Sequence, residues 1–353
     1  MKTTILKLLR TRLSAGAFFA ATAAFALGEY ESNLTKTFSV TPGGKLVVDA
    51  DRGSIEVTTA DAEKVEVQGV RKVWGLSRSR ADEIFAAHEI DFEQKADQVT
   101  VSAKFHGASG GLFDRGGSGL QVCYQISIPK KFNVDLKTAG GSVTLADLTG
   151  AARAQTSGGS LKLGKIDGPV WGQTSGGGIS LASGSGAVDM HTSGGDIQIG
   201  EAGATVSART SGGSIRLDQA KGAVVAETSG GSIAIKKSIG KVSAKTSGGD
   251  IDAGEVRGGI DAETFGGSIS ASLTGQPAED LHLKTSGGGI RLNCAESLAV
   301  DLDAKTSGGR VVTELPVTVV GEYKSSELRG KINGGGPTLL LRTSGGSIYL
   351  NRR

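Results

Sequence analysis

The six-residue sequence TSGGSI occurs at Thr210–Ile215 and recurs unchanged at Thr228–Ile233 and Thr343–Ile348. Variants of it, TSGGDI and TSGGGI, occupy much of the chain around these copies. The threonines that begin the copies are separated by 18 residues at every step from Thr138 to Thr264. A fixed spacing of about 20 residues is typical of a solenoid, in which each repeat forms one coil of a stack.

Each 18-residue repeat contains two nine-residue units with the pattern Gly-x-aliphatic-x-aliphatic, such as Gly177–Leu181 and Gly186–Met190. This alternation predicts a short strand with one apolar face. Glycine suits the bend between strands, through either a positive φ or close backbone packing. We therefore predict an all-β fold: a single-stranded parallel β-helix (β-solenoid) with about 18 residues and two short strands per coil. A left-handed helix of hexapeptides requires an aliphatic residue at every sixth position, and Asp167, six residues after Leu161, breaks that pattern.

Stacked coils place equivalent residues about 4.8 Å apart, so the aliphatic residues form interior ladders. The expected ladders are Val143, Leu161, Ile179, Ile197, Ile215, Ile233, Ile251 and Ile269, and, facing them, Val170, Val188, Val206, Val224, Val242 and Ile260. The motif is thus interpreted as a corner in which threonine ends one strand, Ser-Gly-Gly turns and isoleucine begins the next. The outward residues before each threonine alternate in charge, which predicts attraction between coils: Arg209, Glu227, Lys245, Glu263 and Lys284.

Residues 1–28 have the features of a signal peptide: a basic leader, an apolar stretch at Leu13–Leu27 and a small-residue cleavage site at Ala24–Ala26. A retained membrane anchor is the alternative. Without the four basic residues of this leader, 35 basic residues face 36 acidic ones. This balance gives no electrostatic case for a nucleic-acid partner.

Three further regions follow the signal peptide. Residues 29–137 are expected to form an N-terminal β region that caps the solenoid and carries one inserted helix at Ser79–Glu93. Residues 138–353 are expected to form the glycine-rich solenoid. An irregular insertion at about 312–338 interrupts its period, where prolines and a glycine run predict a bend or projecting loop.

The segments KLVVDADRGSIEV (Lys45–Val57) and YQISIPKKFNVDLKTAGGSVTLADLTG (Tyr124–Gly150) precede the TSGGSI-type copies. Together they resemble the bacterial putative-adhesin family, whose biochemical function is unknown. The resemblance extends from about Phe38 to the C-terminus, and its most specific part is the glycine-rich repeat. It implies a parallel β-helix that is secreted or held at the cell envelope, and it implies no catalytic residues.

Metal and nucleophile chemistry finds little support in the sequence. The histidines, His88, His106, His191 and His282, lack metal-ligand spacing. Cys123 and Cys294 are expected to be separate thiols, with a disulfide as the alternative. We predict no catalytic residue, no cofactor and no metal ligand.

The densest acidic group is Asp250, Asp252, Asp261 and Glu263. Strand alternation predicts that these residues lie on the two outer faces of one coil, on a solvated surface. A hypothetical cation site uses Asp196 and Asp250, at the corner position that serine or glycine occupies elsewhere.

The function predicted from these patterns is non-enzymatic: a secreted or cell-envelope scaffold for adhesion or interaction. The alternative is a carbohydrate-active β-helix enzyme, a polysaccharide lyase or hydrolase. Expected partners are an envelope protein, a glycan or another copy of the chain, and we expect no transmembrane span after signal removal. The expected location is periplasmic, cell-surface or extracellular. Trp171 is interpreted as a cover over the coil edge, with a sugar platform as the alternative.

Overall fold

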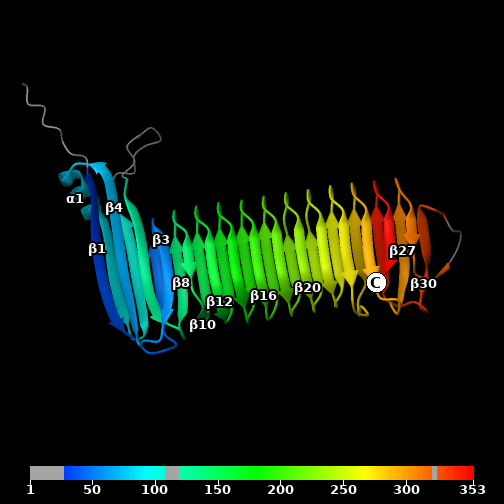
Figure 1. Ribbon diagram of the computed structural model, residues 1–353, viewed down its shortest axis with the longest axis horizontal. Helices are drawn as coiled ribbons and strands as arrows, with labels where there is room; N and C mark the ends of the chain where they lie inside the picture. The colour runs from blue at the N-terminus through cyan, green and yellow to red at the C-terminus, as the bar shows by residue number, and fades with distance from the viewer. Residues whose placement is uncertain (1–27, 108–118, 320–323) are drawn as a thin grey trace, which may run out of the picture.

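The computed structural model describes residues 28–107, 119–319 and 324–353. In these residues the chain forms an elongated stack of β coils (Figure 1). Two sheets of 16 strands each run along the stack, and one helix lies at its N-terminal end. The predicted signal peptide lies outside the described residues, apart from Gly28.

We call the two sheets A and B. In chain order, sheet A contains β1 (Gly28–Ser39), β3 (Ser54–Ala60), β4 (Lys64–Leu76), β7 (Gln121–Pro129), β9 (Val143–Leu145), β10 (Leu148–Thr149), β12 (Leu161–Asp167), β14 (Ile179–Gly184), β16 (Ile197–Ala202), β18 (Ile215–Ala220), β20 (Ile233–Ser238), β22 (Ile251–Val256), β24 (Ile269–Leu273), β26 (Ile290–Cys294), β28 (Val311–Thr313) and β32 (Ile348–Arg352). Sheet B contains β2 (Lys45–Ala50), β5 (His88–Lys95), β6 (Gln98–Phe105), β8 (Asn133–Thr138), β11 (Ala152–Thr156), β13 (Val170–Thr174), β15 (Val188–Thr192), β17 (Val206–Thr210), β19 (Val224–Glu227), β21 (Val242–Lys245), β23 (Ile260–Thr264), β25 (Leu281–Thr285), β27 (Val300–Thr306), β29 (Val317–Val319), β30 (Glu327–Ile332) and β31 (Thr338–Thr343). The helix is α1 (Arg78–Ala87).

The parallel β-helix predicted from the repeat is confirmed. Ile197 of β16 lies between Ile179 and Ile215 in the parallel ladder of sheet A, in the 18-residue register of the sequence. The valine ladder of sheet B has the same register. Both ladders are buried and form a continuous core between the sheets.

Sheet A has a third inward row that the nine-residue pattern did not predict. In β12, Leu161, Leu163 and Ile166 are buried, so the spacing changes from two residues to three. The strand therefore bends between Leu163 and Ile166. The size of the buried residue at this third position varies among later coils, from Ala202 and Ala220 to Val256 and Leu273.

The threonine hydroxyls hold the TSGG corners together. Thr174 Oγ1 donates to the carbonyl oxygen of Gly159 in the preceding coil, 2.7 Å away, and accepts a hydrogen bond from the N–H of Gly177. Thr228 makes the same pair of bonds at another copy of the motif. Since these threonines are buried, the two bonds supply the partners that their hydroxyl groups require.

The second glycine of the corner is required by close packing. A Cβ atom at Gly177 would lie 2.2 Å from the carbonyl oxygen of Gly159. No TSGG glycine among the described residues has a positive φ. The corners therefore require glycine because the backbones of adjacent coils approach closely, and not because of a positive φ angle.

The first coil of the chain is not the outermost coil of the stack. Its strands β2 and β3 lie between β6 and β8 and between β7 and β9, in parallel register on both sides. Antiparallel strands then close this end: β4 and β1 on sheet A, and β5 on sheet B. Parallel stacking in coil register thus begins at Lys45, well before the predicted boundary at residue 138.

The last coil is likewise inserted into the stack. Strand β31 lies between β25 and β27, and β32 lies between β26 and β28. Figure 1 shows the red C-terminal strands between yellow-orange and orange ones. Strands β30 and β29 continue sheet B beyond β27 in antiparallel register and cover that end. Antiparallel strands therefore form the outer edges of both sheets at the N-terminal end, but of sheet B alone at the C-terminal end, where sheet A ends at β28.

The segment expected to be a bend or projecting loop, about 312–338, contains these covering strands. Its glycine run does form a sharp turn, because Asn333, Gly334 and Gly335 have positive φ angles of 47°, 87° and 91°. Asn333 Nδ2 donates to the carbonyl oxygens of Glu296 and Leu298, which fixes the turn over the start of β27.

The N-terminal region differs from its prediction in two places. The helix ends at Ala87, and His88–Lys95 forms strand β5 instead of continuing it, so the predicted helix was wrong in its second half. Apolar residues of this segment fit both a helical and a two-residue period, and antiparallel pairing with β6 decides for the strand. The long edge strand β1 was not predicted, because its sequence is polar and mostly exposed.

Two further expectations concern charges and thiols. In the alternating column, Arg209 pairs with Glu227 at 2.9 Å and Lys284 with Glu263 at 3.2 Å. Both are exposed pairs that contribute about 0–1 kcal/mol each.

Cys123 and Cys294 are separate thiols, as predicted, at opposite ends of the stack.

Candidate functional site

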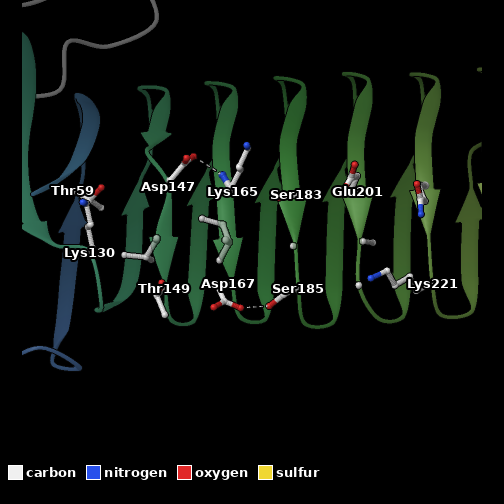
Figure 2. Close-up of a pocket in the computed structure, with 16 residues that line it drawn as sticks. Thr59, Lys130, Asp147, Thr149, Lys165, Asp167, Ser183, Ser185, Glu201 and Lys221 are labelled. Carbon is white, nitrogen blue, oxygen red and sulfur yellow. Dashed lines mark hydrogen bonds between the residues drawn. The ribbon is translucent and has the colours of Figure 1, made fainter.

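Two grooves on the outer surface are the candidate sites, one on each sheet. The groove on sheet A has a volume of 420 Å³ and follows the bend of the strands across successive coils (Figure 2). Its polar lining residues are Thr59, Lys130, Asp147, Thr149, Lys165, Asp167, Ser183, Ser185, Glu201, Gln219 and Lys221. The bend that creates this groove is the one that the nine-residue pattern did not predict.

Two carboxylates of the sheet A groove have structural roles. Asp147 Oδ1 accepts a hydrogen bond from the backbone N–H of Lys165 in the next coil, at 2.8 Å. Asp167 Oδ1 accepts one from Ser185 Oγ at 2.7 Å. These bonds join adjacent coils (Figure 2). The groove is therefore a polar surface of mixed charge whose acidic groups partly serve the stack itself.

The groove on sheet B is the larger of the two, with a volume of 530 Å³. It runs along the stack between two columns of residues that flank the buried row Val134, Ala152 and Val170. One column contains Lys45, Asn133, Ala151, Pro169 and Ala187; the other contains Asp135, Arg153, Trp171 and Asp189. Insertion of the first coil brings Lys45 next to residues about 90 positions later in the chain.

Trp171 is half-buried in the sheet B groove and is stacked against a charged side chain. The guanidinium carbon of Arg153 lies 3.4 Å from the centroid of the indole ring. Asp135 Oδ1 lies 3.9 Å from Arg153 Nε, and Asp135 Oδ2 lies 3.5 Å from Lys45 Nζ, so the carboxylate lies between the two cations. The sequence singled out Trp171 and missed Arg153; the 18-residue spacing between them is the signal that places both in one column.

The acidic cluster is divided between the two sheets, as strand alternation predicted. Asp252 lies on β22 of sheet A, whereas Asp261 and Glu263 lie on β23 of sheet B. Glu263 forms an ion pair with Lys284. The cluster therefore does not bring paired carboxylates to one groove.

The hypothetical cation ligands Asp196 and Asp250 bind the backbone of the next coil. Their Oδ1 atoms accept hydrogen bonds of 2.7 Å from the N–H groups of Ser214 and Ser268. At other corners a serine hydroxyl accepts the equivalent hydrogen bond; for example, Ser214 Oγ accepts one from the N–H of Ser232. Within residues 28–107, 119–319 and 324–353, no three His, Cys, Asp or Glu side chains are placed to hold a metal ion.

One histidine has an unusual environment, at the N-terminal end of the stack. His88 is buried, and its Nε2 lies 3.2 Å from the hydroxyl of Tyr124. Burial and the nearby charge of Arg71 lower the pKa of His88 to about 4, and burial raises the pKa of Tyr124. Both side chains are therefore neutral at pH 7, which is what a buried structural pair requires.

Comparisons with known proteins give structural neighbours only. No family model and no curated protein matches the chain. Three solved structures that match are a putative cell adhesion protein from Clostridium sporogenes (12% identity, 91% of this chain, 100% of that chain, TM-score 0.21), a putative adhesin from Parabacteroides merdae (10%, 91%, 96%, TM-score 0.31) and a putative lipid binding protein from Parabacteroides distasonis (12%, 91%, 96%, TM-score 0.28). Two of these names agree with the family that the sequence resembles. At such TM-scores the overlaps carry no conclusion about fold or function.

Among the described residues, no helix has the length and apolar character needed to cross a bilayer.

Proposed function

We propose that the protein is a non-enzymatic scaffold of the cell envelope or the extracellular space, whose long faces bind a glycan, an envelope protein or a second copy of the chain. The observation that carries this proposal is that the structural residues repeat whereas the surface residues vary. Corner residues and inward ladders repeat from coil to coil, whereas outward columns change, as in Asp135, Arg153, Trp171 and Asp189. Solenoids present extended binding faces in this way: the repeated residues build the stack, and the varied outward residues form the binding surface.

The positions of the acidic groups support a non-enzymatic function. A lyase or hydrolase of this architecture requires carboxylates and bases gathered in one groove. The sheet A groove does gather Asp147, Asp167 and Glu201 beside lysines, but Asp147 and Asp167 are engaged in bonds between coils. Asp252 and Asp261 lie on opposite sheets. The basic leader and apolar stretch at the N-terminus support export to a compartment where such a scaffold meets its partners.

Binding of the purified chain without residues 1–28 to immobilised envelope extract and to a glycan array tests the proposal. A polysaccharide-cleavage assay on the same material is the parallel measurement. We expect saturable binding to a glycan or envelope component and no cleavage. Reproducible cleavage that Asp252→Ala or Asp261→Ala abolishes would show that the protein is an enzyme.

A further inference from the structure

We propose that the sheet B groove beside Trp171 binds a neutral oligosaccharide, with one pyranose ring stacked on the indole. This inference rests on the proposed scaffold function and names the ligand class for one of its faces. It follows from the orientation of the ring, the charge of the groove and its shape.

The indole ring has one covered face and one open face. A guanidinium carbon 3.4 Å from the ring centroid must lie over a face of the ring. Arg153 comes from the preceding coil, so the opposite face is directed toward the next coil, where Asp189 is the register partner of Trp171. Asp189 is shorter than an indole and exposed, which leaves space over that face. The C–H face of a pyranose is the chemical complement of such a ring.

The charges of the groove favour an uncharged ligand. Lys45 and Arg153 supply two positive charges, and Asp135 and Asp189 supply two negative ones. Asp135 lies between the two cations, 3.5 Å from Lys45 and 3.9 Å from Arg153, and with Asp189 the four charges of the groove sum to zero. Asp189 has no ion pair within the described part of the chain, so its carboxylate is available to accept hydrogen bonds from sugar hydroxyls. A uronate or phosphate would meet this carboxylate instead of an unpaired cation.

The groove has room for more than one sugar unit. Between Lys45 and Ala187 it crosses four strand-to-strand steps, which correspond to about 19 Å along the stack. One of its two flanking columns is built from small residues, Ala151, Pro169 and Ala187. Because the open face of the indole is directed along the stack, a pyranose ring on it lies across the groove, and the small residues of this column leave space for a neighbouring sugar unit.

The chain provides its own reporter for this site. It contains two tryptophans, and Trp74 lies on β4 at the N-terminal end, 51% exposed. In a Trp74→Phe background, fluorescence excited selectively at tryptophan comes from Trp171 alone. Titration with cellotetraose and chitotetraose, which are neutral, and with tetragalacturonate, which is anionic, tests ligand class and location together.

We expect at least one neutral tetrasaccharide to change the fluorescence of Trp171 saturably, and tetragalacturonate to leave it unchanged. By calorimetry in the full-length background, Trp171→Ala should weaken binding about tenfold or more. Asp189→Asn should weaken it less, and Trp171→Phe, which keeps an aromatic ring, should retain most of it. Glu201→Gln in the sheet A groove is the matched control and should bind like the unaltered chain.

Three results would overturn the inference: no neutral tetrasaccharide binds, only the uronate binds, or Trp171→Ala binds as well as the unaltered chain while its circular dichroism is native. The scaffold function is judged separately by the envelope-extract assay. If Trp171→Ala still binds the extract, the scaffold function stands and only the proposed sugar site beside Trp171 is rejected.

Discussion

The corner of each coil shows how single residues set the repeat. The two glycines of a corner are adjacent in sequence but differ in environment. A Cβ atom at Gly159 would lie 2.2 Å from the carbonyl oxygen of Gly141, whereas one at Gly158 would lie 3.4 Å from that of Gly140. Both glycines repeat in the sequence. Only the structure shows that the second position excludes a side chain and the first tolerates one.

Substitution at these two positions should therefore have unequal effects. We expect Gly159→Ala to lower the free energy of unfolding by about 1–3 kcal/mol, because backbone atoms of the preceding coil must move. Gly158→Ala should change it by about 0.5 kcal/mol or less. Urea denaturation followed by circular dichroism measures both; equal losses would contradict the close-packing explanation.

His88 should make stability depend on pH. Its pKa is lowered to about 4 in the folded chain, whereas an unfolded histidine titrates near about 6.5. Below pH 6.5 the unfolded state binds more protons, so this contribution to stability is complete above that pH and is lost as the pH falls toward 4. Carboxylates titrate in the same window, and variants must separate the two effects.

The His88→Gln variant should therefore have a flatter profile of unfolding free energy between pH 6.5 and 4 than the unaltered chain. His282→Gln is the matched control, because His282 is exposed on β25 and its removal should leave the profile unchanged. Identical profiles for all three proteins would show that His88 is not a buried neutral base.

At the scale of elements, the two ends of the stack share one feature: the first and last coils of the chain each lie inside the stack. Antiparallel strands lie outside the first coil on both sheets and outside the last coil on sheet B. Ion pairs join the last coil to other parts of the stack: Arg342 with Asp303 at 2.6 Å, Arg352 with Glu296 at 3.0 Å and Arg353 with Glu255 of β22 at 2.7 Å. Among the described strands, β27 is joined to the body of sheet B only through β31.

Deletion of residues 338–353 should consequently release more than the deleted coil. We expect strands β27, β28, β29 and β30 to lose protection from hydrogen exchange, because among the described strands only β31 and β32 join them to the rest of the stack. Coils before residue 281 should stay protected. Arg342→Gln, which removes one ion pair and keeps the strand, serves as the control. Full protection of β27 in the truncated chain would mean that it can stack directly on β25.

At the scale of the molecule, stability is built from nearly equivalent coils that contact only their neighbours. The interior coils share an 18-residue register without exception from Thr138 to Thr264. Such an array tolerates the loss of a whole unit better than the loss of part of one, because the core on either side has the same shape.

Removal of residues 211–228 should yield a folded protein shortened by one strand spacing of about 4.8 Å. Thr210 is then followed by Ser229, which restores a TSGG corner. Removal of residues 211–219 is the control, since half a coil would exchange the strands of the two sheets. Circular dichroism and small-angle scattering distinguish a shortened stack from a disrupted one, and native scattering from the half-coil deletion would contradict the register.

The sequence by itself determined the coil, because its period, its aliphatic ladders and its corners are local and repeat at one spacing. It did not determine the order of coils at the two ends, where strands distant in the chain compete for the same place and pairing decides. Nor did it determine the groove beside Trp171, whose walls combine residues from Lys45 to Asp189. Tertiary structure decided both, because an inserted coil and an outward column exist only once the chain is stacked.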